Sequence, residues 1–488
     1  MRRVNFKFLA ALVLCLLLIA GGVHALHVYQ YANHTVALKK LVDDSKSSSN
    51  TTLRIENLRR YVAIARDDAE SLAELGDLLV ESNRLREAQL SLSTALNLFE
   101  AQGQTDKVVE IRRTLTDIAI RSGKLGDAEF QLDNLIVPLD GESDGVALAD
   151  IDGKERLAQA EYRELLARVR IAQFRWADAN VELGHAIDLD ASRCDSYALR
   201  ADVQADKLEQ YPAAVATLAT MVEQNPAVTR AHFIRGAFRV RKILLGKRDA
   251  EAAPLLAVLQ AEAAQNASSE AAAAGTVPEP LSTSQLLGLA TVDAQRALEL
   301  APDDQDVLLL AMQCAHLYRD APDRAVAEAQ MAAAGEYARR IIDNCEVRFA
   351  AEQANAEAQL RSRWEAEVEK RNALGETVAD VDEAAATSLS AAELQKLRAM
   401  VFLPAVSAFN IAADVAMFQN KPAEAMHALT EGLENVEFDE SLLLNLASLR
   451  ITRPKGDAAA AGQQDEELSR LILQLQRRPE SAPLAAFL

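Results

Sequence analysis

Apolar and small residues recur every three or four positions along most of the chain, and the pattern is clearest in residues 69–103. The first half of this segment places Leu72 and Leu75 on one helical face, and the second half repeats the spacing at Ala88 and Leu92. A strand would alternate every second residue, whereas this spacing matches the 3.6-residue period of a helix. The segment therefore predicts two consecutive amphipathic helices.

A small residue returns at the same place in the second helix of each later unit. The alanine at position 88 has counterparts at Ala128, Ala179, Ala214, Ala290 and Ala425. With Gly76 in the first helix, this spacing resembles the tetratricopeptide repeat (TPR), in which two antiparallel helices touch at small residues. The resemblance covers most of residues 35–450, with gaps. It implies an all-α fold, namely a TPR-like right-handed helical solenoid of antiparallel helix pairs behind an N-terminal transmembrane helix.

Polar, acidic and glycine- or proline-containing stretches interrupt the pattern and mark the expected boundaries. Trp364 lies in one interruption and is either an exposed anchor for a partner or partly buried. The predicted order is a transmembrane anchor or signal peptide (1–28), repeats (29–140), a linker (141–153), repeats (154–245), a flexible insert (246–284), repeats (285–345), a charged helical arm and loop (346–389), repeats (390–453), and a linker with a terminal helix (454–488).

The N-terminus combines basic residues with an apolar run at residues 8–20. A signal peptide cleaved near Ala25 would have this composition, and so would a membrane anchor over residues 6–28. We favour the anchor, with secretion after cleavage as the alternative. Because basic residues stay on the cytoplasmic side, either interpretation places the repeats in the periplasm or an equivalent extracytoplasmic compartment. Thr35 to Val42 is expected to form a separate short helix.

Composition excludes several classes of function. The formal net charge of −20 disfavours nucleic-acid binding, because an acidic surface repels the phosphate backbone. The four cysteines are widely spaced and form no CxxC pair, so neither a disulfide framework nor a metal site is expected. Nucleophile-elbow, zinc-protease and phosphate-loop motifs do not occur. We therefore predict no catalytic residue, no cofactor and no metal, and expect that the protein is not an enzyme.

The TPR resemblance implies a binding groove lined by fixed positions of each opening helix. These positions place charged residues of three repeats on one concave face, with more acidic than basic side chains. A partner that is basic or amphipathic would suit such a groove. The candidate groove residues are Glu70, Asp77, Glu81, Glu110, Arg113, Asp117, Glu161, Glu164 and Arg168.

The lysine and asparagine pattern with which some TPR proteins clamp a peptide carboxylate is absent from these positions. An anchor followed directly by repeats resembles membrane-anchored bacterial TPR proteins, including some from planctomycetes. The resemblance implies a non-enzymatic protein–protein interaction scaffold, tethered to the membrane with its repeats on the non-cytoplasmic side. The alternative is an accessory or regulatory module of a larger protein whose catalytic part lies beyond residue 488.

Overall fold

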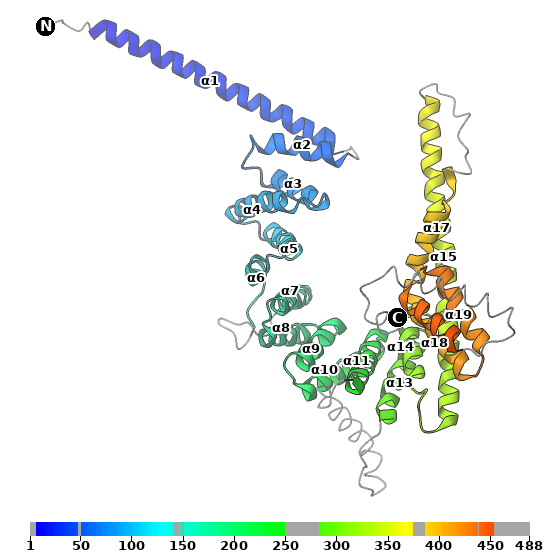
Figure 1. The fold of residues 1–488 in the computed structure, drawn as a ribbon. Coiled ribbons are helices and arrows are strands. Elements are labelled where there is room, and N and C mark those ends of the chain that lie inside the picture. Colours follow the sequence, from blue (N-terminus) through cyan, green and yellow to red (C-terminus); the bar gives the residue numbers. More distant parts are fainter. Residues whose placement is uncertain are drawn as a thin grey trace. The chain divides into compact units, whose positions relative to one another are not determined.

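A computed structural model describes residues 6–46, 50–139, 147, 151–248, 283–373, 386–437 and 439–452. All regular secondary structure in these ranges is helical, which confirms the all-α prediction for this part of the chain. The chain forms two compact units, Met1–Leu208 and Glu209–Leu488, and each is described by itself (Figure 1).

The first unit is a succession of helices in which each packs on the next along the chain. Such nearest-neighbour packing is the organisation of a solenoid. The helices are α1 (Phe6–Ser45), α2 (Thr51–Val62), α3 (Ala69–Glu81), α4 (Leu85–Gln102), α5 (Thr105–Arg121), α6 (Leu125–Asp133), α7 (Gly153–Ala172), α8 (Trp176–Leu189) and α9 (Cys194–Asp206).

Small residues set the distance between the two helices of a pair. Ala88, Ala128 and Ala179 are fully buried, as their place in the sequence pattern requires. Gly76 of α3 faces Leu92 of α4 so closely that a Cβ at position 76 would lie 2.5 Å from Leu92 Cδ2. The repeating alanines and this glycine are therefore contact points rather than generic helix formers.

Five of the turns inside helix pairs share one feature of backbone conformation. Each of these five contains a residue with positive φ, and in four of them the next amide N–H donates to the carbonyl five residues before it, as Arg84 does to Leu79 at 2.8 Å. This is the helix-ending Schellman arrangement, which favours glycine or asparagine. In these five turns the residues with positive φ are Asn83, Gly123, Phe174, Glu209 and Asn420, and the turn at Glu209 is the one without that hydrogen bond.

The second unit contains the remaining helices. They are α10 (Tyr211–Gln224), α11 (Thr229–Arg248), α13 (Thr283–Leu300), α14 (Gln305–His316), α15 (Arg324–Ala373), α17 (Ala391–Phe402), the 3-10 helix η3 (Leu403–Ala405), α18 (Val406–Phe418), α19 (Pro422–Asn435) and α20 (Glu440–Thr452). The predicted flexibility of the insert falls mostly on residues 249–282, and the predicted terminal helix on residues 453–488. Both lie outside the described residues.

Helices α11 and α13 pack against each other as one helix pair, although residues 249–282 separate them in the sequence. Asp293 of α13 is buried and accepts hydrogen bonds from Arg235 (2.7 Å) and Arg239 (2.7 Å) of α11. A buried carboxylate is stable only when it is paired and hydrogen-bonded in this way. The two arginines therefore tie together two helices that are distant in sequence.

Helix α15 continues through residue 346 without a break and is 50 residues long. One face of its first half is buried, with Met331 and Ile341 at 0% exposure in the core of the second unit. Most side chains beyond Phe349 are partly or fully exposed, and Trp364 is partly buried rather than exposed.

The N-terminal helix differs from the prediction. A separate helix over Thr35–Val42 is wrong, because α1 runs unbroken from Phe6 to Ser45. Residues 24–45 contain no glycine or proline that would interrupt it. The same helix therefore crosses the boundary expected at residue 28.

The helix that could span a membrane by length and composition is also not the one that the sequence predicts. Among the described residues, one helical stretch, Ala391–Phe418, is long and apolar enough to cross a membrane, and half of its most apolar window is buried. Phe402 and Phe409 in that stretch are 0% exposed, so it serves as a core element of the second unit. Among the residues of α1 whose side chains the structure describes, the apolar stretch is Cys15–His24, which is too short to span a membrane. The N-terminal transmembrane helix is therefore not supported on this measure.

We predict that Gly76→Ala destabilises the first unit by about 1–3 kcal/mol, because the added methyl group overlaps Leu92 and forces α3 and α4 apart. Urea unfolding followed by circular dichroism measures the change. Gly126→Ala is the matched control, since a Cβ there meets nothing within 4 Å. The control should be neutral or stabilising by roughly 0.5–1 kcal/mol. Equal stability of the two variants would contradict the close contact at Gly76.

Candidate partner-binding groove

Most of the predicted groove residues gather around two hollows of the first unit. The hollows lie along α3, α5 and α7, which are the opening helices of three successive repeats. We call them the acidic hollow, which is lined mainly by α3, and the apolar hollow, which is lined mainly by α5 and α7.

The acidic hollow has a volume of about 510 Å³. Glu70, Asp77 and Glu81 line it, as the spacing on α3 predicts. Its other polar residues are Glu74, Arg54 and Lys107, and its less polar residues are Ala73, Leu78 and Phe99. Arg54 donates to Glu74 at 3.3 Å, and Lys107 donates to Glu110 at 2.8 Å. Glu110 therefore takes part through Lys107 rather than by lining the hollow.

The carboxylates of this hollow outnumber its cations, and the effect is visible at Asp77. Loss of hydration and the nearby charges of Glu110 and Glu81 raise the pKa of the Asp77 carboxyl above its ordinary value of 3.8, although the side chain still reaches solvent. The charge of Lys107 opposes the shift without cancelling it. An added cation in the hollow would therefore be stabilised.

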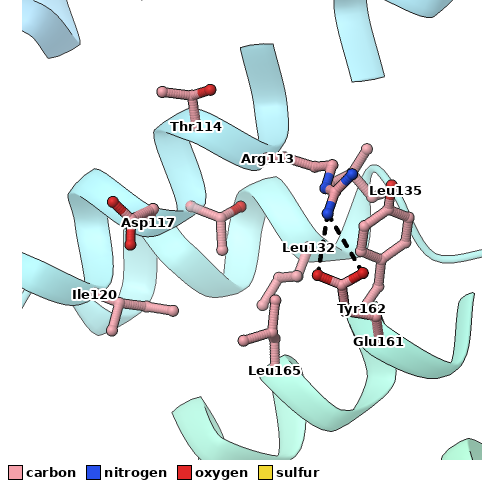
Figure 2. A pocket seen from close by; sticks show the side chains of 10 residues that line it. Arg113, Thr114, Asp117, Ile120, Leu132, Leu135, Glu161, Tyr162 and Leu165 are labelled. Atoms are coloured by element: carbon pink, nitrogen blue, oxygen red, sulfur yellow. Dashed lines mark hydrogen bonds and ion pairs between the residues drawn. The ribbon is translucent and has the colours of Figure 1, made fainter. Parts of the chain in front are cut away.

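The apolar hollow has a volume of about 410 Å³ and is shown in Figure 2. Arg113 of α5 reaches across to Glu161 of α7 and donates to its two carboxylate oxygens at 3.0 and 3.3 Å. The guanidinium carbon also lies 5.8 Å from the centroid of the Tyr162 ring, within the range of a cation–π contact. Apolar side chains form the floor, namely Ile120, Leu132, Leu135 and Leu165.

Asp117 stands on the side of the apolar hollow opposite the Arg113–Glu161 pair (Figure 2). It also accepts a hydrogen bond from Arg121 at 3.2 Å. The hollow therefore combines an apolar floor with a charged rim of both signs.

Glu164 and Arg168 lie outside both hollows. The Glu164 carboxylate is buried and accepts hydrogen bonds from Ser196 (2.6 Å) and Arg193 (2.8 Å), which lie at the start of α9. Burial raises its pKa, but the hydrogen bonds from Ser196, Arg193 and Arg168 outweigh that effect and lower the pKa below its usual value. Glu164 therefore holds α9 against α7, and Arg168 covers it from the solvent side at 2.9 Å.

Several lining residues do not follow from the repeat positions used for the prediction. Glu74 and Tyr162 occupy other positions of the opening helices, and Lys107 precedes the counted start of its repeat. Leu132 and Leu135 come from the second helix of a pair and the turn after it. The period of the sequence shows that these two leucines face inward, but not which hollow they reach.

The part of the chain that the structure describes contains no group of three or more histidine, cysteine or acidic residues arranged to hold a metal ion. Cys194, Cys314 and Cys345 are buried thiols. Burial, together with the charge of Asp293, raises the pKa of Cys314 to about 12, so the reactive thiolate is strongly disfavoured there.

No family model matches the chain, and no curated protein matches it. Solved structures to which it is similar include a TPR protein from Parabacteroides merdae (10% identity, 78% of this chain, 96% of that chain, TM-score 0.37). Another is the C-terminal part of a TPR repeat-containing protein from Cytophaga hutchinsonii (12% identity, 76% and 98%, TM-score 0.39). The yeast Tom70 structure is a third (13% identity, 91% and 91%, TM-score 0.26). These likenesses are remote, so the conclusions below rest on the side chains of this chain.

Two aspartates of the same helix pair should affect stability with opposite signs. The pKa of Asp77 is raised, so its ionised form opposes folding at neutral pH, and Asp77→Asn should stabilise the first unit at pH 7. Burial raises the pKa of Asp68, but hydrogen bonds from Ser71 and Tyr61 and the charge of Lys39 lower it overall, so Asp68→Asn should destabilise. For each variant, the difference in free energy of unfolding from the unchanged protein should become smaller as the pH falls through the folded-state pKa of the aspartate.

Urea unfolding at a series of pH values between about 7 and 3 measures both effects, because the ordinary carboxyl pKa lies near the end of that interval. Asparagine can still accept the hydrogen bond from the Ser71 backbone N–H at the start of α3. Its amide nitrogen cannot accept from the Tyr61 and Ser71 hydroxyls, so the variant removes these hydrogen bonds together with the charge. A destabilising Asp77→Asn at pH 7 would contradict the charge excess in the acidic hollow.

Proposed function

We propose that this protein is a non-enzymatic interaction scaffold of the TPR type, whose groove binds a basic, amphipathic segment of a partner protein. The observation that carries the proposal is the succession of an acidic hollow and an apolar hollow along the opening helices of neighbouring repeats. A segment with a basic residue and an apolar residue at matching separation would satisfy both hollows at once.

Electrostatics support the basic part of this segment. Glu70, Glu74, Asp77 and Glu81 line the acidic hollow, against Arg54 and Lys107. Arg54 and Lys107 already bind Glu74 and Glu110, which leaves Asp77 without a compensating cation of its own. A lysine or arginine from a partner would supply that charge and lower the raised pKa of Asp77.

The shape and lining of the apolar hollow support the amphipathic part. The floor offers four aliphatic side chains, while the Arg113–Glu161 pair and Asp117 offer polar groups at the rim. A leucine, methionine or phenylalanine side chain would bury apolar surface there, and the partner backbone would meet the polar rim.

Neutralising the acidic hollow should weaken binding selectively. Peptides selected from a displayed random library against the full chain should combine lysine or arginine with a large apolar residue. The triple variant Glu70→Gln, Asp77→Asn and Glu81→Gln should bind such peptides roughly tenfold more weakly, since each exposed charge pair contributes about 0.2–1 kcal/mol. The affinity of the unchanged protein should also fall with added salt.

The matched control removes three exposed acidic side chains of the second unit, by Glu299→Gln, Glu328→Gln and Glu336→Gln. This variant has the same net charge as the triple groove variant and should bind normally. Equal loss of binding in both triple variants would show that net charge, rather than the acidic hollow, determines binding. Selected peptides without basic residues would contradict the proposal.

We further propose that α1 tethers the scaffold to a membrane, with the repeats on the non-cytoplasmic side. Residues 6–28 in helical form are roughly 34 Å long, which is enough for about 30 Å of hydrocarbon. The described side chains from Cys15 to His24 are all exposed, and Leu16, Leu17, Leu18 and Ile19 expose 57–68% of their area on every side of the helix. A helix that is apolar all round needs a surrounding apolar medium.

Fractionation of cells that express the full chain tests this tether. We expect the protein to stay in the membrane pellet after alkaline carbonate extraction, and a variant lacking residues 2–28 to become soluble. Added protease should degrade the repeats in spheroplasts but not in intact cells. A mature N-terminus at Leu26 would show that the protein is cleaved and secreted rather than tethered. Protection of the repeats from protease in spheroplasts would contradict the proposed side of the membrane.

A further inference from the structure

Phe174 occupies a backbone conformation that does not suit it. It lies in the turn between α7 and α8 with φ of 63°. The equivalent turn positions of other repeats carry Asn83, Gly123 and Asn420, which tolerate the left-handed region, and Glu209, which is not aromatic. A bulky aromatic residue there is a genuine outlier, and such outliers cluster at functional sites.

Packing within the chain does not explain why an aromatic residue stands at position 174. Its side chain is 77% exposed, the highest value among the exposed large hydrophobic residues of the described ranges. Its ring meets the edge of Trp176 with a centroid distance of 5.7 Å. The Trp176 ring in turn lies 5.2 Å from the Lys207 ammonium group. Phe174 is therefore the outermost member of a short stack and presents most of its ring to solvent.

Three more exposed apolar residues recur at one register position of the first unit. Leu90, Phe130 and Val181 each stand two residues after the buried alanine of a second helix, and they are 73%, 61% and 51% exposed. We call these three residues and Phe174 the turn-edge patch. Exposed apolar residues that recur in register over neighbouring repeats mark an interaction surface rather than scattered surface hydrophobics.

Hydrogen bonds link the residues next to the patch from one repeat to the next. Gln89, next to Leu90, accepts a hydrogen bond from Lys124 of the α6 turn at 2.8 Å. Glu129, next to Phe130, accepts hydrogen bonds from Gln173 (3.0 Å) and Arg175 (2.6 Å), which flank Phe174. The polar groups beside the patch are therefore paired within the chain, so covering the patch would not strand these charges.

The charge of this edge indicates which partner it fits. Residues 84–90, 124–130 and 173–181 together contain four basic and four acidic side chains, whereas the whole chain carries a net charge of −20. Two copies of so acidic a chain repel each other over most of their surface. They approach with least repulsion through a face that is both neutral and apolar.

We propose that the turn-edge patch is the interface at which a second copy of this chain docks, with the same patch of both copies meeting across a two-fold axis. Phe174 is the central anchor of this interface, and its backbone strain is retained because the ring is needed there. The interface lies outside the two hollows, so a dimer of this kind leaves both grooves open to a partner.

Site-specific photocrosslinking tests the identity of the occupant. The full chain is expressed with two different tags in the same cells, with Phe174 replaced by p-benzoylphenylalanine, and the intact cells are irradiated. We expect an adduct that carries both tags at about twice the 53.0 kDa of one chain. The same replacement at Val347, which is 72% exposed in the second unit, is the control and should give no such adduct. An adduct with a different protein, or none, overturns the proposal.

The variant Phe174→Asn separates docking from folding. Asparagine suits the left-handed turn, so the unfolding midpoint should stay the same or rise, while co-purification of the two tagged forms falls at least tenfold. Binding of the selected groove peptides should not change. A lower unfolding midpoint would show that Phe174 serves the fold, and unchanged co-purification would show that the patch does not hold a second copy. Either result overturns the proposal.

Discussion

The close approach of two helices at a small residue is the contact on which the first unit depends. Ala88, Ala128 and Ala179 have no exposed surface, and Gly76 leaves no room for even one more carbon atom beside Leu92. Because each helix packs mainly on its neighbours in sequence, no larger core compensates for a misplaced pair. The hollows are shaped by side chains whose separation this contact fixes.

Charge is distributed around that contact in two ways. Inside the unit, ionised groups have specific partners: Arg193 neutralises Glu164, and Ser196 donates a hydrogen bond to it. In the acidic hollow, carboxylates are in excess. Their repulsion, together with loss of hydration, disfavours the ionised form of Asp77 and raises its pKa. The turn-edge patch has balanced charge and exposed apolar side chains. Each face of one acidic chain is thus suited to a different kind of partner.

The sequence predicts the all-helical architecture because the 3.6-residue period and the recurring alanines are local and regular. Helical spacing alone also places Glu70, Asp77 and Glu81 on one face of α3, where they line the acidic hollow. It does not identify Glu164 as a buried link to α9, because the residues that bury it lie in another repeat. The hydrophobic pattern also does not predict that α1 is one continuous helix or that Phe174 has a positive φ, because neither feature changes the spacing of apolar residues.

The pairing of α11 with α13 bears on how this chain tolerates variation in length. Buried Asp293 and the arginines of α11 hold the two ends of the intervening segment at a fixed separation, whatever lies between them. The entropy of bringing the two ends of a flexible chain together grows only with the logarithm of its length, by about 0.6 kcal/mol for each doubling. Insertions or deletions at this place therefore cost little, and the repeat can gain or lose sequence there without losing its register.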